Sequence, residues 1–380
     1  MSKVLFVARY PLQGKYNLRA KFDGQMQAIQ TLGYDVYYLA YDNLFYYIVH
    51  NQRKTPLRRV FATNSSFFHH FLSYVYLYKS VVRVLESNDW KSVDCAYIRS
   101  MPRDYYWGKM KKKMNDIGMQ IVVENPTYIT KGDETPKLFI RVIRGFLKIF
   151  GKDKYTTLYT LIGDKTNGFF NNTPAINIDN GVNVQAFTPR TPTRHNGFNM
   201  VAVGNMADWH GFDRVINGLS KYDNKDCIHF YVVGNDGDGS LGKWKKISES
   251  KGLSDIVHFT GPLFGDELLE LLNKCDVAFA SLGLYRTGCF NASVLKSREY
   301  MSRGIPFVYA VNDPVLDLSP IKYALKISND ETPVDIKQIV CFAKDISHSS
   351  NMINEMREYA IKHMSWEGQF EKVFDSLKNN

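Results

Sequence analysis

Several common features are missing from this sequence of 380 residues, and each absence excludes a class of protein. No window approaches the roughly eighteen uninterrupted apolar residues that a membrane-spanning helix needs. The five cysteines form no CxxC pair, so neither structural zinc nor a redox motif is predicted. The N-terminal MSK leads directly into VLFVA, which is too short for the apolar core of a secretory signal. We therefore expect a cytoplasmic protein with no metal, in which Cys95, Cys227 and Cys275 are buried free thiols.

Positive charge is unevenly distributed along the chain. Residues 1–187 contain 26 Lys and Arg against 14 Asp and Glu, whereas the remainder contains 22 against 24. A one-sided charge attracts anionic partners, so the N-terminal half is predicted to meet a membrane surface, a phosphate-bearing acceptor or nucleic acid. A surface that only keeps the protein soluble is the alternative. No recognised nucleic-acid motif is present, and nucleic acid is not expected as a partner.

Strand-like and helix-like segments alternate along both halves of the chain. Apolar runs such as residues 3–8 and 198–204 are typical of buried parallel strands, and amphipathic segments follow them. Residues 43–64 are aromatic and basic without a clear period, and residues 187–199 have the composition of a linker. The sequence therefore predicts an α/β protein with parallel sheets and two domains, at 1–188 and 198–365.

Ligands of open parallel sheets bind beyond the carboxyl ends of the strands, so the loops after strands are the informative ones. In VGNMADWHGFDR, Gly204 permits a close approach of the backbone to a ligand, and the following helix start favours an anion. His210 and Arg214 could add positive donors there. In VVGNDGDGS, Gly234 ends a strand, but no GK[ST] follows, so this is not a P-loop. Ordinary turns are the alternative for both loops.

A third loop and its helix combine opposite charges. Arg286, Thr287 and Gly288 lie in the loop, and Lys296 and Glu299, three residues apart, share one face of the helix. A carboxylate suits ribose hydroxyls and an ammonium suits a pyrophosphate. A surface ion pair is the alternative, and it would contribute little.

With these loops in order, the C-terminal half resembles the GT-B fold of glycosyltransferase family 4. The resemblance is carried by INIDNGVNVQAFTP, VAVGNMADWHGFDRVINGL, FYVVGNDGDG through CDVAFASL, SVLKSREYMSRGIPFVYA and MSWEGQF. It implies two Rossmann-like domains whose parallel sheets face each other across a cleft. It also implies a donor-binding second domain, an acceptor-binding first domain, and a C-terminal helix at about 366–380 that packs back on the first domain.

The resemblance assigns roles residue by residue. Glu299 aligns with the second glutamate of the family's EX7E pair, which binds the donor ribose. Asn291 stands where the first glutamate would contact the sugar, so the donor sugar stays open. The family's arginine and lysine on the diphosphate would fall near Asn205 and His210, so His210 and Lys296 are expected to carry the phosphate charge. The remaining donor-binding positions are Thr260 and Leu263 for the base, and Ser293 and Val294 at the helix start. Gly14 could let the first loop of the N-terminal half approach the donor phosphates.

The acceptor site is expected at the strand ends of the first domain. Its candidates are Arg9, Arg99 and Arg103, and Glu124 is a candidate acid or base. A buried structural carboxylate is the alternative for Glu124. The resemblance implies a retaining enzyme with front-face attack and no enzyme nucleophile. Glu124, His210 and Lys296 are the predicted catalytic residues. The donor would be a UDP- or GDP-linked sugar, without a further cofactor.

A basic stripe and an apolar stripe share the segment KLFIRVIRGFLKIFGK. Lys137, Arg141, Arg144 and Lys148 fall three or four residues apart, a pattern typical of helices that lie on anionic bilayers. A core helix with a solvated face is the alternative. Contact of residues 137–150 with the inner face of the cell membrane would suit a polyprenyl-diphosphate-linked or other glycan acceptor in surface or capsular polysaccharide biosynthesis. A catalytically inactive GT-B protein that binds a sugar nucleotide or a partner enzyme is the competing hypothesis.

Overall fold

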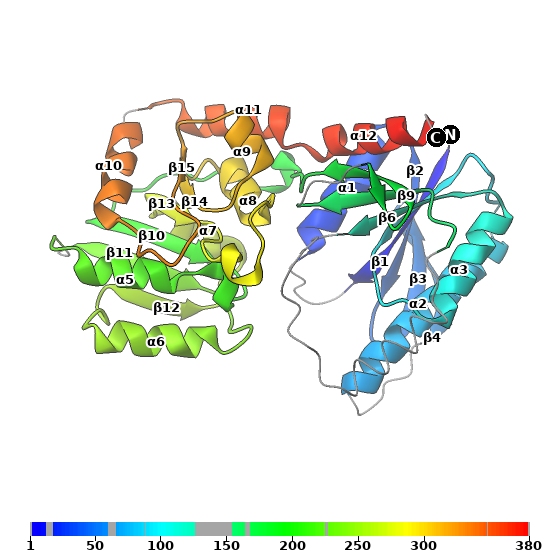
Figure 1. The fold of residues 1–380 in the computed structure, drawn as a ribbon, viewed down its shortest axis with the longest axis horizontal. Helices are drawn as coiled ribbons and strands as arrows, with labels where there is room; N and C mark the ends of the chain where they lie inside the picture. Colours follow the sequence, from blue (N-terminus) through cyan, green and yellow to red (C-terminus); the bar gives the residue numbers. More distant parts are fainter. Residues whose placement is uncertain are drawn as a thin grey trace. The chain divides into compact units, whose positions relative to one another are not determined.

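The structure of the chain, a computed structural model, describes residues 2–12, 18–59, 66–87, 89–125, 154–163, 168–224, 227–347 and 349–378. The chain divides into two compact units. The first extends to Ile178 and regains the C-terminal segment from Trp366, and the second contains Asp179–Ser365. Each unit is a sheet covered by helices, as Figure 1 shows.

The sheet of the first unit has the order β4-β3-β2-β1-β5-β6-β7-β9-β8 within the described residues. Its central strands are parallel to their neighbours. They are largely buried on both faces, which explains why they appear in the sequence as continuous apolar runs. The parallel strands are β1 (Lys3–Pro11), β2 (Asp35–Tyr41), β5 (Cys95–Arg99), β6 (Gln120–Asn125), β7 (Leu158–Ile162) and β9 (Thr173–Ile178). The short β8 (Phe169–Phe170) pairs antiparallel with β9.

An antiparallel hairpin extends this sheet at one edge, where the sequence predicted no regular element. It consists of β3 (Phe45–His50) and β4 (Arg53–Arg59). The turn residues Asn51 and Gln52 both have positive φ, 46° and 64°, as in the tight turns that match strand twist. The edge strand β4 is mostly exposed and basic, so it lacks the apolar alternation that identifies a strand in sequence.

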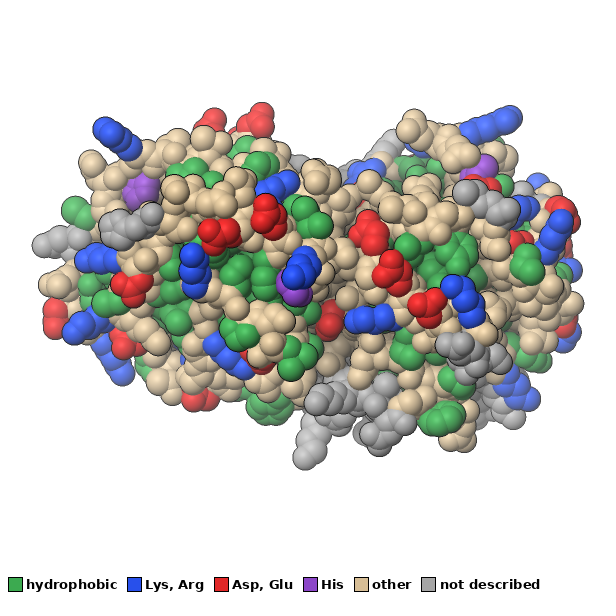
Figure 2. Space-filling view, turned by 90° about the horizontal axis from the view of Figure 1, so that it is seen from above, with side chains coloured by type: hydrophobic (Ala, Val, Ile, Leu, Met, Phe, Trp, Pro, Cys, Tyr) green, Lys and Arg blue, Asp and Glu red, His purple; other side chains and the backbone are tan. Residues whose placement is uncertain are grey.

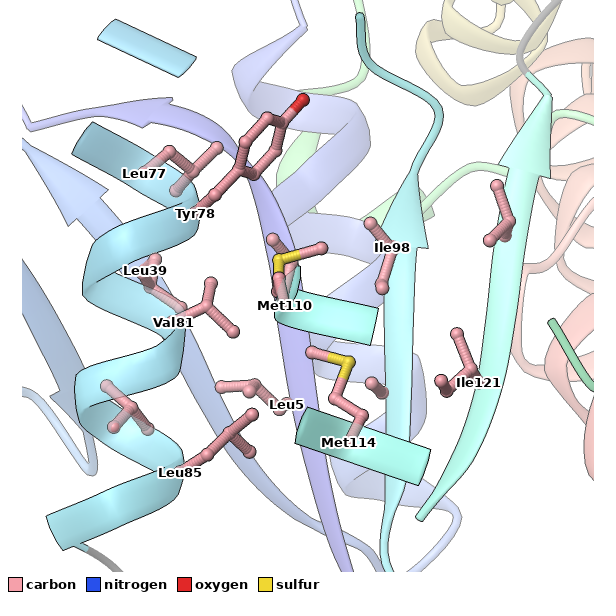
Figure 3. Close-up of a cluster of buried hydrophobic side chains, with 14 of the residues drawn as sticks. Leu5, Leu39, Leu77, Tyr78, Val81, Leu85, Ile98, Met110, Met114 and Ile121 are labelled. Carbon is pink, nitrogen blue, oxygen red and sulfur yellow. The ribbon is translucent and has the colours of Figure 1, made fainter. Parts of the chain in front are cut away.

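Two helices cover one face of the first sheet. Figure 3 shows side chains of α2 (Ser66–Ser87) and α3 (Tyr105–Asp116) directed onto the strands, and all of them are buried. Burial of each large apolar side chain contributes roughly 1.5–3 kcal/mol, so this face is a main source of stability for the unit. The residues in contact are Leu77, Tyr78, Val81, Leu85, Met110 and Met114 of the helices and Leu5, Leu39, Ile98 and Ile121 of the strands.

The opposite face is covered by α1 (Arg19–Thr31) and α12 (Trp366–Lys378). The rings of Tyr34 and Phe374 stack with centroids 4.0 Å apart, and Phe370 meets Tyr97 edge-on at 5.0 Å. The helix α12 is therefore part of the core of the first unit, although the whole second unit lies between it and the rest of that unit in the sequence.

The sheet of the second unit has the order β12-β11-β10-β13-β14-β15, and its recorded pairings are all parallel. The chain moves outward from β10 to β12 and then returns to the other side of β10. Such a reversal of strand order is where open α/β sheets bind ligands. The strands are β10 (Phe198–Val203), β11 (Ile228–Val233), β12 (Val257–Gly261), β13 (Val277–Phe279), β14 (Phe307–Tyr309) and β15 (Ala324–Lys326).

Helices pack on both faces of the second sheet. One core includes residues of α5 (Asp213–Lys221), α6 (Ser240–Ser250) and α10 (Ile336–Ser347). The other includes residues of α7 (Gly265–Asn273), α8 (Leu295–Arg303) and α11 (Met352–His363). The connections also contain α9 (Pro314–Leu318) and the short helices η1 (Val184–Ala186), η2 (Asp208–His210) and η3 (Leu284–Thr287).

The boundary between the units differs from the one placed at 188. The first unit ends at Ile178, because the next residues pack into the second. Val182 and Val184 belong to an apolar core of the second unit, and Asn180 is hydrogen-bonded to Ser293 there. Among the thiols, Cys95 and Cys275 are buried as expected, but Cys227 is exposed, since it lies in the turn before β11 rather than in the strand.

Candidate functional site

Backbone alone forms much of the carboxyl edge of the second sheet. Strands β10 and β11 are each followed by a glycine, Gly204 and Gly234, and β12 ends in Gly261. The Gly204 N–H donates to Val233 O at 2.9 Å, and the Gly234 N–H donates to Gly261 O at 2.9 Å. A Cβ on Gly234 would lie 1.6 Å from Gly204 O, so the ends of β10 and β11 approach each other too closely for a side chain at residue 234.

The ammonium of Lys296 occupies the space that Gly204 leaves open. A Cβ on Gly204 would lie 2.7 Å from Lys296 Nζ and 3.5 Å from His210 Nε2. The ammonium also contacts His210 Nε2 directly. Lys296 comes from the first turn of α8, whereas His210 ends η2 after β10, so two distant segments meet at this point. We call Gly204, His210 and Lys296 the strand-end cluster.

Charge at the strand-end cluster is poorly compensated. Burial, and then the neighbouring Lys296, lower the pKa of His210 to about 2, so this imidazole is neutral. Burial also lowers the pKa of Lys296 to about 7, and the attraction of Glu299 only partly opposes it. No ion pair of Lys296 is recorded among the described residues. An anion arriving here would supply the missing partner and would restore the charged ammonium.

Trp209 lies over the strand-end cluster. Its ring stacks on His210 with centroids 3.7 Å apart, and Lys296 Nζ lies 5.4 Å from the indole centroid. His210 is 1% exposed, whereas Trp209 is 37% exposed. In the sequence this tryptophan could be interpreted as packing beneath the turn, and it was not predicted as a site residue. The signal for it is its place in WHG, in the loop that follows a strand.

Arg286 does not join this cluster as a free cation. Its guanidinium forms ion pairs with Asp213 at 2.8 Å, Glu331 at 2.7 Å and Asp208 at 3.2 Å. Burial alone would lower its pKa, but these carboxylates outweigh burial and raise it. Arg286 therefore ties η3 to η2 and α5, which differs from the predicted donor-binding role. Thr287 and Gly288 end η3, where Thr287 Oγ1 donates to Leu284 O.

The predicted ribose carboxylate is available on α8. Glu299 is partly exposed and forms an ion pair with Arg303 at 2.9 Å through one oxygen. Ser293 is buried before the helix and accepts a hydrogen bond from the Asn180 N–H, so its hydroxyl holds the loop in place. Val294 is the N-cap residue, and no side chain caps this helix start.

Four other predicted donor-binding residues lie in the loops after the strands of this sheet or at the end of one of them. Asn205 is exposed directly after β10. Thr260 is exposed on β12, and Leu263 packs partly into the core beside α7. Asn291 pairs with Asn312, whose side-chain amide donates to Asn291 Oδ1 at 3.3 Å. Asn205 adjoins the strand-end cluster through its peptide bond to Gly204, whereas no contact of Thr260, Leu263 or Asn291 with the cluster is recorded among the described residues.

Glu124, at the end of β6, is the centre of a buried polar network in the first unit. It is 0% exposed. One carboxylate oxygen accepts hydrogen bonds from Gln25 and Tyr97, both at 2.6 Å. The other accepts from Lys21 at 2.9 Å and Arg99 at 3.4 Å. Burial alone would raise the pKa of Glu124, but Lys21, Arg99 and the hydrogen bonds outweigh it, so the pKa is lowered.

These contacts correct the prediction that Glu124 is a catalytic acid or base. Its two oxygens are saturated and inaccessible, so it has no room to exchange a proton with a substrate. The structure favours the alternative of a buried structural carboxylate. The supporting residues Lys21 and Gln25 were not predicted, because only the packing of α1 on the sheet brings them to β6.

The predicted acceptor-binding arginines lie at the carboxyl side of the first sheet. Arg9 of β1 has its guanidinium over the rings of Tyr41 and Tyr74, at 5.5 and 5.2 Å from the ring centroids. Arg99 ends β5, faces Glu124 and lies over Phe22. Arg103 is partly buried between β5 and α3. Gly14 and the basic segment 137–150 lie outside the described residues.

Neither a metal-binding cluster nor a membrane-spanning helix is found in the described part of the chain. Across the described part of the chain, no group of three or more His, Cys, Asp or Glu side chains is arranged to hold a metal ion. No described helix has both the length and the hydropathy for a bilayer crossing. On the face drawn in Figure 2, basic and acidic side chains are interspersed and neither sign forms a continuous patch.

Known proteins resemble the second unit in sequence and the chain in fold. Residues 197–313 match the family model described as "Glycosyl transferases group 1". No curated protein matches the sequence. A glycosyltransferase structure from Rickettsia africae has a TM-score of 0.62 and 11% identity, covering 100% of this chain and 98% of that one. The strand-end cluster lies within the segment that this family model matches.

Two further solved structures extend the likeness. HepE of Anabaena in complex with UDP has a TM-score of 0.59 and 12% identity, with 100% of both chains covered. Sucrose-phosphate synthase of Thermosynechococcus elongatus has a TM-score of 0.62 and 11% identity, also with 100% of both chains covered. At such identities the likeness concerns the fold: the chain has the GT-B fold, with two Rossmann-like α/β units.

Proposed function

We propose that this protein is a retaining glycosyltransferase of the hexosyltransferase class. It would transfer a sugar from a UDP- or GDP-linked donor to a glycan or lipid-linked glycan in surface polysaccharide biosynthesis. The family match over residues 197–313 supports the transferase class, and HepE, a structural neighbour, is described in complex with UDP. The type of sugar, the acceptor and the retaining outcome are part of the proposal.

The observation that carries the proposal is the Lys296 ammonium held over Gly204. It lies at the carboxyl edge of a parallel sheet, beside the reversal of strand order, at the uncapped start of a helix. A helix start already favours an anion, so a lysine there for which no ion pair is recorded among the described residues supports binding of a doubly charged group. A diphosphate fits this requirement better than a neutral ligand.

Catalysis would depend on stabilisation of the leaving diphosphate. Lys296 would neutralise the charge that develops on the diphosphate oxygens as the glycosidic bond breaks, and His210 would hold the ammonium in position. The fixed backbone at Gly204 and Gly234 would keep this arrangement in place before the donor arrives. Glu299, one turn along α8, would bind ribose hydroxyls. The leaving diphosphate would assist removal of the proton from the acceptor hydroxyl, so no nucleophile of the protein is required.

The acceptor is assigned to the first unit. Arg9, Arg99 and Arg103 come from the carboxyl side of its sheet, and an anionic or lipid-diphosphate acceptor would suit them. We keep the inner face of the membrane as the proposed location, with residues 137–150 as the contact. The excess of basic residues in the N-terminal half supports this choice.

A second candidate is a GT-B protein that binds a sugar nucleotide without transferring the sugar. Asn291 replaces the first glutamate of the family's pair, and its Oδ1 is already engaged by Asn312. Asn205 and His210 replace the usual cations, and His210 is neutral. If Lys296 does not supply the missing positive charge, these substitutions would leave the protein with little or no sugar transfer.

One experiment separates the two candidates. Purified wild-type protein is screened by calorimetry against UDP, GDP, ADP and their common sugars, and release of nucleoside diphosphate is then measured with lipid-linked and free glycans. We expect tight binding of one nucleotide family and acceptor-dependent release that Lys296→Ala abolishes. Binding without release, across the acceptor panel, would support the inactive protein. Absence of any nucleotide binding would contradict both.

A further inference from the structure

Trp209 presents an aromatic face that the fold leaves open. His210 stacks on the indole at 3.7 Å, and Lys296 Nζ lies 5.4 Å from its centroid. The side chain is nevertheless 37% exposed, so part of the ring stays accessible to a ligand. A single exposed tryptophan is common on protein surfaces; what distinguishes this one is its place beside the strand-end cluster, where a ligand held by Lys296 would meet it.

The fold holds this indole in a fixed place. Its support, His210, is 1% exposed; with Nε2 facing the Lys296 ammonium as acceptor, the Nδ1–H of the neutral ring donates to Ala207 O at 3.2 Å. The carbonyl of His210 accepts from the Leu282 N–H at 2.8 Å, which ties this turn to the loop after β13. The same turn is joined to η3 through the Arg286 ion pairs. A platform fixed in this way loses little entropy when a ligand stacks on it.

The position of Trp209 relative to Lys296 determines which part of the donor Trp209 can contact. The order of strands places the loop after β12, where the base is expected, on one side of β10. Trp209 stacks on His210, and the carbonyl of His210 is hydrogen-bonded to Leu282 in the loop after β13. This loop lies on the other side of β10. A donor whose diphosphate lies on Lys296, with its base toward β12, therefore extends its sugar toward Trp209.

We infer that the open face of Trp209 stacks against the pyranose ring of the donor sugar. The inference rests on the proposed function, because it takes the diphosphate on Lys296 as its fixed point. Pyranose rings have an apolar face of C–H groups, and indoles offer a broad, flat and electron-rich partner for it. The contact is tolerant of hydroxyl configuration, so Trp209 contributes affinity for a sugar ring and leaves the choice among sugars to polar neighbours.

The test compares a nucleotide with its own sugar conjugate. Calorimetry gives the dissociation constants of UDP and UDP-glucose, or of the nucleotide and sugar that wild-type protein prefers, for wild type, Trp209→Leu and Trp209→Phe. Leucine keeps apolar cover over His210 but removes the flat face, whereas phenylalanine retains one. We expect Trp209→Leu to bind the nucleotide sugar roughly three- to tenfold more weakly while UDP affinity stays within about twofold. Trp209→Phe should keep most of the wild-type affinity.

Each other outcome has a definite meaning. Equal losses for UDP and for the nucleotide sugar would overturn the inference, because they would indicate a base stacked on the indole or a displaced Lys296. Unchanged affinity for both would also overturn it. Tyr105→Ala removes another exposed aromatic ring, on α3 of the first unit, and should change neither constant. If wild-type protein binds no nucleotide at all, the proposed function fails first, and this inference fails with it.

Discussion

The Lys296 ammonium rests against the Cα of Gly204, so closely that an added Cβ would lie 2.7 Å from both Nζ and Cε. The two residues are distant in sequence, one after β10 and one in the first turn of α8. The ammonium can occupy this position only because residue 204 has no side chain.

Gly204→Ala should weaken nucleoside diphosphate binding by about tenfold, because the new methyl group displaces the ammonium. The fold should tolerate the change, since the displaced group is the end of a flexible side chain. Calorimetry with UDP or GDP measures the affinity. Gly242→Ala is the matched control: its Cβ meets nothing within 4 Å on α6 and should raise stability slightly without altering binding. Equal affinity in Gly204→Ala and wild type would remove this contact from the site.

Diphosphate binding should depend on pH through Lys296. Its pKa is about 7 in the free protein, and a bound diphosphate would raise it, so binding takes up a proton. Affinity should therefore be greatest below pH 7 and should decline as the pH rises above it. The ratio of wild-type to Lys296→Met affinity, measured from pH 6 to 9 with the same nucleotide, cancels the titration of the nucleotide itself. A ratio that does not change with pH would contradict the role of this ammonium.

Lys296→Met should also discriminate between phosphates. Loss of a charged hydrogen bond costs about 1.5–3 kcal/mol, which corresponds to a roughly ten- to hundredfold loss for the diphosphate. The loss for UMP or GMP should be smaller, because the distal phosphate is the group expected on the ammonium. Equal losses for mono- and diphosphates would place the distal phosphate elsewhere.

Glu299→Ala should abolish nucleotide binding without unfolding the protein. The carboxylate is partly exposed and its pair with Arg303 is an i,i+4 contact on a helix, which contributes only about 0.3–0.5 kcal/mol. Thermal unfolding with and without nucleotide measures both effects. Asp116→Ala removes the comparable Lys112–Asp116 pair on α3 and should leave the ligand-induced shift intact. Wild-type affinity in Glu299→Ala would exclude Glu299 from the ribose site.

Glu124→Gln should destabilise the first unit by about 3–5 kcal/mol, since it leaves the buried Lys21 without its counter-charge. Denaturant unfolding measures the change. The pKa of Glu124 is lowered in the folded protein, so its contribution is complete above the unfolded carboxyl value near ~4.3. It should be lost as the pH falls through the lowered folded value. A variant with wild-type stability but altered activity would restore the catalytic assignment that the structure argues against.

Much of the architecture is visible in the sequence, for local reasons. Continuous apolar runs mark the buried parallel strands, and glycines such as Gly33 and Gly304 mark helix ends, where both have positive φ. The β3–β4 hairpin escaped prediction because an exposed, basic edge strand has no apolar alternation. The two-residue turn at Asn51 and Gln52 also lacks the glycine that usually signals such a turn.

The sequence predicted which loops form the candidate site, but only some of the contacts between their side chains. The strand-end position of Gly204 and the helix position of Lys296 follow from the pattern, yet their contact with His210 does not. Arg286 looks like a phosphate ligand in sequence, and three carboxylates from other segments neutralise it. Glu124 looks like an acid or base at a strand end, and Lys21 from α1 converts it into a buried ion pair.

The sequence by itself determined the alternation of strands and helices and the loops that follow the strands, because hydrophobic period and glycine conformation act over a few residues. Only the tertiary structure decided which charged side chains form ion pairs within the protein and which remain available to bind a ligand. That decision depends on the distances between segments far apart in the chain, and on burial, which makes an unpaired charge costly and a paired one unavailable. Lys296 and Arg286 are similar cations in the sequence, and only their surroundings distinguish them.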